Sequence, residues 1–396
     1  MVDVITSHHN PGITIRSFSD NPEKVSSLAT AFIKGTQEAG VAAVAKHFPG
    51  KGAAEVDAHI DLPTVAVPRK TFETIHLFPF KKAAENGVKG IMSTHIYCPA
   101  LDGRRLSPAT FSPKIVRDYL RTRLHFEGVI FSDDLEMGAI AKHYPIEEAC
   151  LKATAAGHDM LLICSNYQRQ KQGFRSLVDA YDTGQLPAEE FERSVKRIKK
   201  VKKFCTMNTS LTAEDTSLQS DALARRIAEQ SITIISDDTH LIPLNNKKTN
   251  QLLMLIPDLS PLPVREKGYD PTEHHFLIKE CARSFIGTRT FHFFPLNPGK
   301  REIDQIKKLV NRHHLCLAFI SNAQGNEGQR LLIKELQKLK NDIIFALMDN
   351  PFDYEFLSTH TTCITSYGLR KIQLISLLKI IAGKAKATGT LPFEKR

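Results

Sequence analysis

The sequence predicts an α/β protein with parallel sheets, and three observations support this class. Short β-branched runs, apolar on both faces, alternate with amphipathic stretches through the first half of the chain. Polar residues gather directly after several of these runs, where the carboxyl ends of parallel strands carry active sites. A second series of strands and helices follows a segment rich in Thr and Ser. Because 396 residues exceed one ordinary core, we expect two domains.

The first half is expected to contain five strands separated by helices. Lys46-His47, Ser93 to His95 and Ser132 to Asp134 follow three of these strands, which favours a (β/α)8 barrel over an open sheet. The expected strands are 2–6, 41–46, 90–94, 128–132 and 159–164, and the expected helices are 22–39, 69–86, 113–124, 146–156, 168–182 and 187–204.

The segment 206–220 is predicted to be a linker, which divides the chain into domains 1–205 and 221–396. The second domain again alternates strands with helices, as an α/β unit does. Its expected elements are helix 221–230, strands 232–236, 252–257, 315–320 and 343–348, and helix 328–339.

The net charge of +10 raises the question of nucleic acid. In the basic run 195–203, however, Val195, Ile198 and Val201 recur at helical spacing, so the lysines are expected on the solvated face of a helix. We therefore predict no nucleic-acid partner and instead a mildly basic surface that attracts an anionic substrate. The sequence does not predict an oligomeric state.

The cysteines and the apolar stretches bear on location. Seven cysteines without a CxxC pair are typical of a reducing compartment and argue against disulfides and structural zinc. The longest apolar stretches, such as 343–348, are far too short for a membrane span, and no signal peptide opens the chain. These features predict a soluble cytoplasmic protein.

The first candidate site is the loop KHFPGKG at 46–52, followed by Asp57 and His59. Its glycines and proline predict a loop after a strand, where catalytic groups sit. Asp57 can orient the imidazole of His59, and a histidine paired in this way exchanges a proton near neutral pH. The alternative is a solvated glycine-rich loop in which both residues are incidental.

The second candidate site is the strand that ends in Asp133 and Asp134. A carboxylate at the mouth of a sheet can attack a sugar C1 atom or ligate a metal. No spacing of His, Asp and Glu supplies a complete metal ligand set, so we predict no metal. The alternative role is capping of the next helix, and the two acids can divide these roles. His95 is either a ligand or structural, and His158 is interpreted as structural.

Taken together, the motifs resemble the family 3 β-N-acetylglucosaminidases of peptidoglycan recycling. The resemblance covers residues 2 to about 205 in the order of the family, and the segments that open and close the second domain resemble the C-terminal α/β sandwich of its two-domain members. The matching motifs are KHFPGKG with DAH, GVIFSDDLEMGAI, AAGHDMLLIC, Arg16-Ser-Phe and GIMSTH at 90–95.

The resemblance implies roles for individual residues. Asp133 matches the nucleophile of the family, and His59 matches its acid/base, which takes the place of the second carboxylate of most retaining glycosidases. Asp57 matches the partner that orients the histidine. The residues that match the N-acetylglucosamine-binding positions are Arg16, Lys46 and His47.

Two departures from the family stand out. Lys51 occupies the place of a second histidine and keeps a donor and a positive charge. The expected strand 2–6 matches roughly the third barrel strand of the family, so we expect an N-terminally incomplete barrel. This departure bears on activity and on location, because upstream units, including any signal peptide, have no counterpart here.

The sequence leaves several functions open. The leading hypothesis is removal of terminal β-linked N-acetylglucosamine from a peptidoglycan fragment through a covalent intermediate on Asp133. Phosphate can replace water as the acceptor, because a neutral histidine repels an anion less than a carboxylate does. The alternatives are a family 3 β-glucosidase and a vestigial protein that binds carbohydrate without turnover. No cofactor is implied, since the sequence has no phosphate loop or dinucleotide fingerprint.

Overall fold

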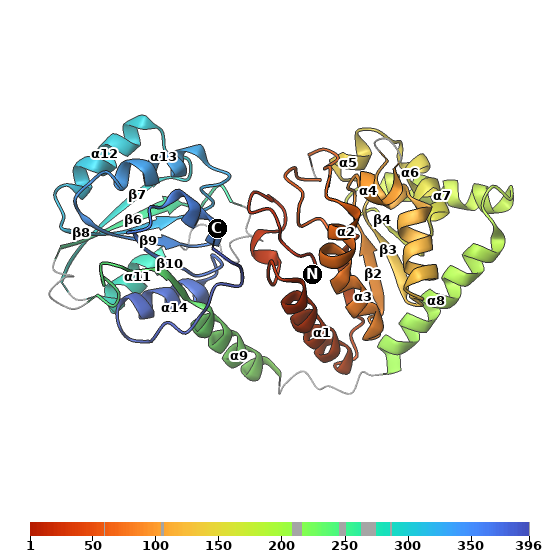
Figure 1. Ribbon diagram of the computed structural model, residues 1–396, viewed down its shortest axis with the longest axis horizontal. Coiled ribbons are helices and arrows are strands. Elements are labelled where there is room, and N and C mark those ends of the chain that lie inside the picture. Colours follow the sequence, from red (N-terminus) through yellow and green to blue (C-terminus); the bar gives the residue numbers. More distant parts are fainter. Residues whose placement is uncertain are drawn as a thin grey trace. The chain divides into compact units, whose positions relative to one another are not determined.

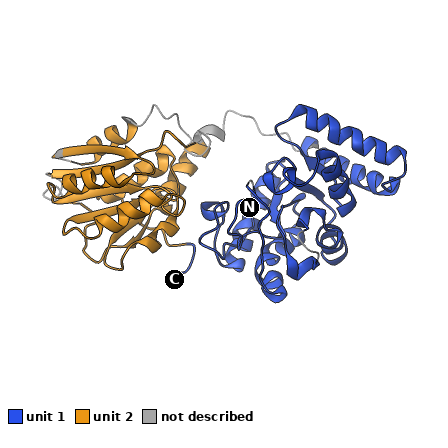
Figure 2. Cartoon of the chain, turned by 90° about the horizontal axis from the view of Figure 1, so that it is seen from above, with its two compact units in different colours: residues 1–211, 392–396 blue, residues 212–391 orange. Residues whose placement is uncertain are grey.

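The computed structural model describes residues 1–58, 60–103, 107–207, 216–244, 251–262, 275–285 and 287–395. The chain forms two compact units, one made of Met1–Leu211 with Pro392–Arg396 and the other of Thr212–Leu391 (Figure 2). No helix in the described ranges is long and apolar enough to cross a membrane. The assignment of the catalytic role to 1–205, with 206–220 as linker and 221–396 as a second domain, stays a prediction.

The first unit is built on four parallel strands in the order β1-β2-β3-β4 (Figure 1). Within the described residues this sheet is open, and helices connect its strands, as the sequence predicted for a run of βα units. The strands are β1 (Val44–Phe48), β2 (Gly90–Ser93), β3 (Val129–Asp134) and β4 (Met160–Leu162).

Local sequence signals set the ends of the helices. The side chain of Asn21 accepts a hydrogen bond from the Lys24 backbone N–H at 2.8 Å and so begins α1. Gly157 ends α6 at a φ of 111°, which favours glycine. The helices are α1 (Pro22–Glu38), α2 (Arg69–Thr71), α3 (Phe78–Glu85), α4 (Pro99–Asp102), α5 (Gly138–Ala141), α6 (Ile146–Ala156), α7 (Tyr167–Asp182) and α8 (Ala188–Met207).

The expected strand 2–6 is wrong. The segment is buried beside β1, but its backbone N–H groups bond to three different places instead of to one neighbouring strand. The N–H of Val2 donates to Lys46 O at 2.8 Å, that of Ile5 to Ser19 O at 3.2 Å and that of Thr6 to Gly52 O at 3.2 Å. The segment therefore packs beside β1 without being a strand of the sheet.

The expected helix 69–86 is interrupted. It consists of α2, a π-helical turn at Phe72–His76 and α3. Pro79 stands at the start of α3 and has no N–H to continue the ladder, while the N–H of Leu77 bonds to Phe72 O five residues back at 2.8 Å. The expected helix 113–124 is likewise a π-helix at Lys114–Arg123.

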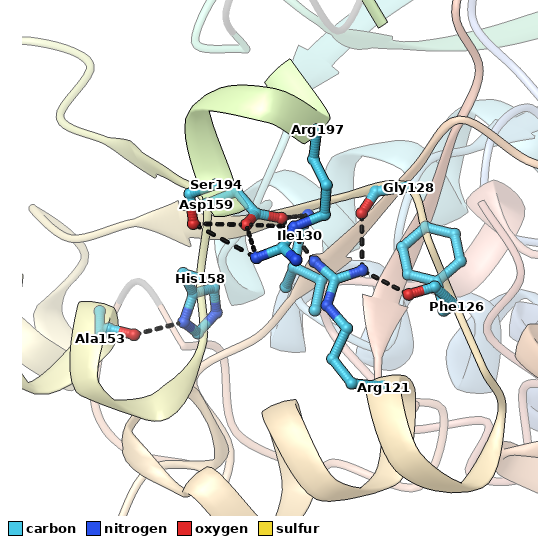
Figure 3. A network of polar contacts seen from close by, with 9 residues as sticks. All are labelled: Arg121, Phe126, Gly128, Ile130, Ala153, His158, Asp159, Ser194 and Arg197. Carbon is cyan, nitrogen blue, oxygen red and sulfur yellow. Dashed lines mark hydrogen bonds and ion pairs between the residues drawn. The ribbon is translucent and has the colours of Figure 1, made fainter. Parts of the chain in front are cut away.

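A buried ion-pair network joins the amino ends of β3 and β4 to α8 (Figure 3). The side chain of Asp159 is fully buried and contacts Arg121 at 2.6 Å and Arg197 at 2.8 Å. It also accepts hydrogen bonds from the Ser194 hydroxyl at 2.7 Å and the Ile130 N–H at 2.8 Å. Each oxygen of the carboxylate therefore has at least two donors, as a buried charge requires.

The described residues of the second unit form a sheet of six strands in the order β5-β10-β9-β8-β6-β7, all parallel except β5. The sequence predicted four of them and missed β7 and β10. The strands are β5 (Thr233–Ser236), β6 (Gln251–Asp258), β7 (Thr288–Pro295), β8 (Leu315–Ile320), β9 (Asp342–Leu347) and β10 (Thr362–Thr365).

Helices cover both faces of this second sheet (Figure 1). Leu252 and Met254 of β6 pack with α11 (His275–Ser284) and α14 (Lys371–Ile381). Leu253, one position away, packs on the other face with α12 (Lys300–Val310) and α13 (Glu327–Leu336). Helix α9 (Thr216–Ser231) begins inside the expected linker. The sequence missed α11, α12 and α14.

Two carboxylates, Asp349 and the fully buried Asp353, lie near the carboxyl ends of β8 and β9. Asp349 accepts hydrogen bonds from the Ser321 hydroxyl at 3.1 Å and the Asn322 N–H at 2.9 Å. Asp353 accepts the N–H groups of Ala323 at 2.7 Å and Gln324 at 3.0 Å. Burial and the neighbouring Asp349 raise the pKa of Asp353 to about 8, so Asp353 holds a proton at neutral pH.

The last residues of the chain pack on the first unit. The Ser19 hydroxyl donates to Pro392 O, and the Glu394 N–H donates to the Asp20 carboxylate at 3.0 Å. The rings of His8 and Phe393 lie 5.7 Å apart. The sequence did not predict this return of the chain to its first unit.

The Asp159 network yields a stability prediction. Asp159→Asn should lower the free energy of unfolding of the first unit by about 3 kcal/mol or more, because two partly buried guanidinium groups lose their counter-charge. Urea unfolding followed by circular dichroism measures the change. The control is Glu127→Gln, which removes an exposed pair with Lys200 and should leave the midpoint nearly unchanged. Equal effects of the two variants would contradict the prediction.

Asp353 yields a prediction about pH. Because its pKa is near 8 in the folded state and near 3.8 in the unfolded state, the folded state binds the extra proton between these values. Stability of the second unit should therefore fall as pH rises through this window. Asp353→Asn imitates the protonated acid and should remove this part of the slope. Urea midpoints of both proteins at pH 6, 7, 8 and 9 test it, and parallel curves would contradict it.

Candidate functional site

The candidate site lies at the carboxyl ends of β1 and β3, where parallel strands present their last residues at the same edge of the sheet. Lys46 and His47 belong to β1, which runs two residues further than expected, to Phe48. Asp133 belongs to β3, which also continues beyond its expected end. The sheet thus gathers residues that are far apart in the sequence.

A buried carboxylate at Asp3, which the sequence did not single out, holds the loop after β1. One oxygen of Asp3 accepts hydrogen bonds from His47 Nδ1 at 2.9 Å and from the His47 N–H at 3.0 Å. The other accepts the Lys51 N–H at 2.8 Å. Burial alone would raise the pKa of Asp3, but His47 and the Lys51 N–H outweigh it and hold the pKa at about 2.

His47 is almost fully buried, and its burial lowers the pKa of the imidazole although Asp3 opposes the shift. His47 is therefore neutral near pH 7. Since an ionised carboxylate only accepts hydrogen bonds, the ring proton sits on Nδ1 and Nε2 is left as an acceptor. Asp133 also acts to raise the pKa of His47, so the predicted nucleophile lies within electrostatic range of the imidazole.

Asp133 and Asp134 have different surroundings. One oxygen of Asp133 accepts the Asp134 N–H at 3.0 Å. Asp134 accepts the N–H groups of Glu136 at 3.0 Å and Cys164 at 3.2 Å, which ties the turn after β3 to the segment after β4. The residue that caps α5 is Met137, so neither acid caps that helix. Asp134 holds the turn, and Asp133 is the acid within electrostatic range of His47.

Lys51 is only 7% exposed, and its ammonium lies within electrostatic range of Asp133, Asp57 and Arg16. Burial lowers the pKa of its ammonium, while Asp3, Asp133 and Asp57 raise it and Arg16 lowers it. Lys51 therefore lies within the electric field of the predicted nucleophile. The positive charge that the sequence predicted at this position faces the site rather than bulk solvent.

The Arg16 segment is joined to the loop after β1 through Asn10. The Asn10 side chain accepts the N–H groups of Gly12 at 3.0 Å and Ile13 at 2.9 Å, and it donates to Lys51 O at 2.7 Å. The exposed Arg16 donates to Gly12 O at 2.8 Å. The structure thus brings Arg16 to the edge of the same site.

The loop that carries Asp57 packs on the segment after β3. The Ala139 N–H donates to Ala58 O at 3.0 Å, and both alanines pack with Met137. The His143 ring contacts the Asp61 carboxylate at 3.3 Å. His59, the predicted acid/base, lies outside the described residues. The described part of its loop nevertheless reaches the same strand end as Asp133.

The two other histidines that the sequence singled out, His95 and His158, have hydrogen-bond partners inside the protein. His95 is fully buried, and its ring nitrogens contact Thr110 Oγ1 at 2.8 Å and Asp134 O at 2.9 Å. His158 donates from Nδ1 to Ala153 O at 2.8 Å and accepts the Ser93 hydroxyl at Nε2, also at 2.8 Å. Burial lowers the pKa of His158 to about 4. Both rings therefore hydrogen-bond within the protein near the ends of strands, as structural histidines do.

Sequence reasoning missed Asp3 and Asn10. Asp3 did carry a signal, since it is the one charged residue in the apolar run 2–5, and a charge in a buried run needs a partner. Asn10 carried none, because its partner Lys51 lies far along the sequence. Among the described residues, no group of three or more His, Cys, Asp or Glu side chains is placed to hold a metal ion.

Comparison with solved structures supports the predicted fold. A glycoside hydrolase family 3 β-N-acetylglucosaminidase from Paenibacillus sp. str. FPU-7 superposes with a TM-score of 0.87 and 29% identity over 99% of this chain and 75% of that chain. The predicted fold class, a barrel-like α/β domain followed by an α/β sandwich domain, is thereby confirmed.

Comparison with known sequences gives the same relationship. The chain is 28% identical to β-hexosaminidase A of Pseudoalteromonas piscicida, over 99% of this chain and 72% of the relative. A β-hexosaminidase of Nitrosospira multiformis is 41% identical over 38% of this chain and 42% of the relative. Residues 1–201 match the glycosyl hydrolase family 3 N-terminal domain. Since this match covers more than half of the 396 residues, the chain belongs to glycosyl hydrolase family 3.

Proposed function

We propose that this protein removes terminal β-linked N-acetylglucosamine by a retaining mechanism. The observation that carries the proposal is the position of Asp133 at the end of β3, within electrostatic range of His47 and of the buried Lys51. A nearby cation such as Lys51 favours the anionic form of a carboxylate, which is the form that attacks a sugar C1 atom. The names of the relatives, β-hexosaminidase and β-N-acetylglucosaminidase, support the choice of sugar.

In this mechanism Asp133 attacks C1 and forms a covalent glycosyl-enzyme. His59 protonates the leaving oxygen and then activates the water that releases the sugar, and Asp57 orients His59. Arg16, Lys46 and His47 bind the sugar hydroxyls and the acetamido group. The neutral His47 suits this role, since its Nε2 accepts a hydrogen bond from a hydroxyl while Asp3 holds Nδ1.

The natural substrate is proposed to be a peptidoglycan fragment. A net charge of +10 favours an anionic aglycone, such as one with free carboxylates, over a neutral one. Rates with a carboxylate-bearing muropeptide and with a neutral chitooligosaccharide test this choice, and faster turnover of the neutral sugar would refute it. The cytoplasmic location remains a prediction.

The nucleophile yields the first activity prediction. Asp133→Asn should reduce the release of nitrophenol from the β-N-acetylglucosaminide by roughly a thousandfold or more, because an amide cannot form the glycosyl-enzyme. The matched control is Asp134→Asn, which keeps an oxygen for the N–H groups of Glu136 and Cys164. This control should lose far less activity.

Equal losses in the two variants would assign both acids to the fold instead of to the chemistry. Absence of turnover by a wild-type chain that is demonstrably folded would sink the proposed activity. Binding of N-acetylglucosamine without turnover would then favour the alternative of a vestigial carbohydrate-binding protein. Turnover of the glucoside in preference to the N-acetylglucosaminide would favour a β-glucosidase.

Retention yields a second prediction, about the product. Proton NMR of the first product should show the β anomer of N-acetylglucosamine, because two successive displacements at C1 restore the configuration. The α anomer as the first product in water would overturn the retaining mechanism. The same experiment with added phosphate separates hydrolysis from phosphorolysis, since phosphorolysis gives the sugar 1-phosphate.

A further inference from the structure

Asp3 is a buried carboxylate whose hydrogen-bond donors are an imidazole ring and two backbone N–H groups instead of a lysine or arginine side chain. Asp3 and His47 are 0% and 2% exposed, and the carboxylate accepts two hydrogen bonds from His47 and one from Lys51. The donors belong to the end of β1 and to the loop that follows it, which lead into the candidate site. The carboxylate therefore fixes both the backbone of this loop and the ring of His47.

The contact also sets which ring nitrogen of His47 faces the site. Because Asp3 can only accept, the neutral imidazole keeps its proton on Nδ1, and Nε2 is the nitrogen left for other contacts. A rotated ring, or the opposite tautomer, would present a different hydrogen-bonding atom there. A negative charge on Asp3 also favours the imidazolium if Nε2 takes up a proton.

We propose that Asp3 is a positioning residue that fixes the ring orientation and the tautomer of His47, and that it acts on the bound sugar only through His47. This inference rests on the proposed function, since it assumes that His47 contacts the substrate. The hydrogen bond from Lys51 to Asp3 anchors the loop independently.

The variant Asp3→Asn tests whether the Asp3 carboxylate positions the His47 ring or only anchors the loop through Lys51. The asparagine side chain has nearly the same shape but only one acceptor oxygen, so its NH₂ group must face either the His47 donors or the Lys51 N–H. His47→Asn is a matched partner variant, because it keeps an N–H near the position of Nδ1 and removes Nε2. The pair forms a double-mutant cycle.

The proposal predicts a strongly non-additive cycle. Asp3→Asn alone should lower kcat/KM for the nitrophenyl β-N-acetylglucosaminide by about 10- to 100-fold, the range for a hydrogen bond to a charged group. In the His47→Asn background the same change should cost about threefold or less, because the residue through which it acts is already altered. Equal losses in both backgrounds would overturn the proposal.

Asp159→Asn controls for a merely structural role. It also removes a buried, ion-paired carboxylate of the first unit, but at the amino ends of the strands. It should lower stability yet leave kcat/KM of the folded fraction within about twofold of wild type. A loss as large as that of Asp3→Asn would assign the effect to general stability and refute positioning.

NMR of the histidine rings tests the same arrangement without turnover. In wild type, ¹⁵N shifts of neutral His47 should report the Nδ1–H tautomer, and the opposite tautomer would refute the proposal even if Asp3→Asn does not fold. In folded Asp3→Asn the pKa of His47 should fall, because the charge that raises it is lost, and an unchanged pKa would count against it. If the wild type lacks turnover, the proposed function fails, whereas these spectra still decide the role of Asp3.

Discussion

The first unit depends on one physical constraint, which is that a carboxylate removed from water must be fully partnered. A buried carboxylate with several hydrogen-bond donors lies at each end of its sheet. At the amino ends, Asp159 collects two arginines, a hydroxyl and a backbone N–H, and so fastens α8 to the strands. At the carboxyl ends, Asp3 collects the ring and backbone of His47 and the backbone of Lys51. One end consolidates the fold, and the other shapes the candidate site.

The alternation of strands and helices could be predicted from the sequence because the strands are apolar on both faces. In β6, Leu252 and Leu253 pack on opposite faces, which gives the uninterrupted run that the sequence shows. Strand β7 was missed because its run Thr288–Pro295 mixes Arg, Thr and His with aromatic residues. Strand β10 was missed because Thr362–Thr365 is short and half polar. Both are defined by pairing with other strands, β7 with β6 and β10 with β9 and β5, and a local pattern does not contain this pairing.

The expected strand 2–6 shows the opposite failure. Its composition is that of a strand, but its backbone bonds to β1, to the loop after β1 and to the Arg16 segment. Tertiary partners therefore decided its conformation. The same cause bears on the candidate site, where motifs predicted Asp133, His47 and Arg16, whereas the contacts of Asp3 and Asn10 with Lys51 are seen only in the structure.

The return of residues 392–395 to the first unit changes how the second unit should be regarded. With Pro392 bonded to Ser19 and Glu394 to Asp20, residues 212–391 are topologically an insertion within the first unit and not an appendage after it. The chain therefore passes between the two units twice, at the junctions 211–212 and 391–392, instead of once. An exchange of the second unit between relatives would have to preserve both junctions. A fragment cut at residue 205 would lose the partners of Ser19 and Asp20 as well as the second unit, so its properties would not be those of the first unit as it occurs here.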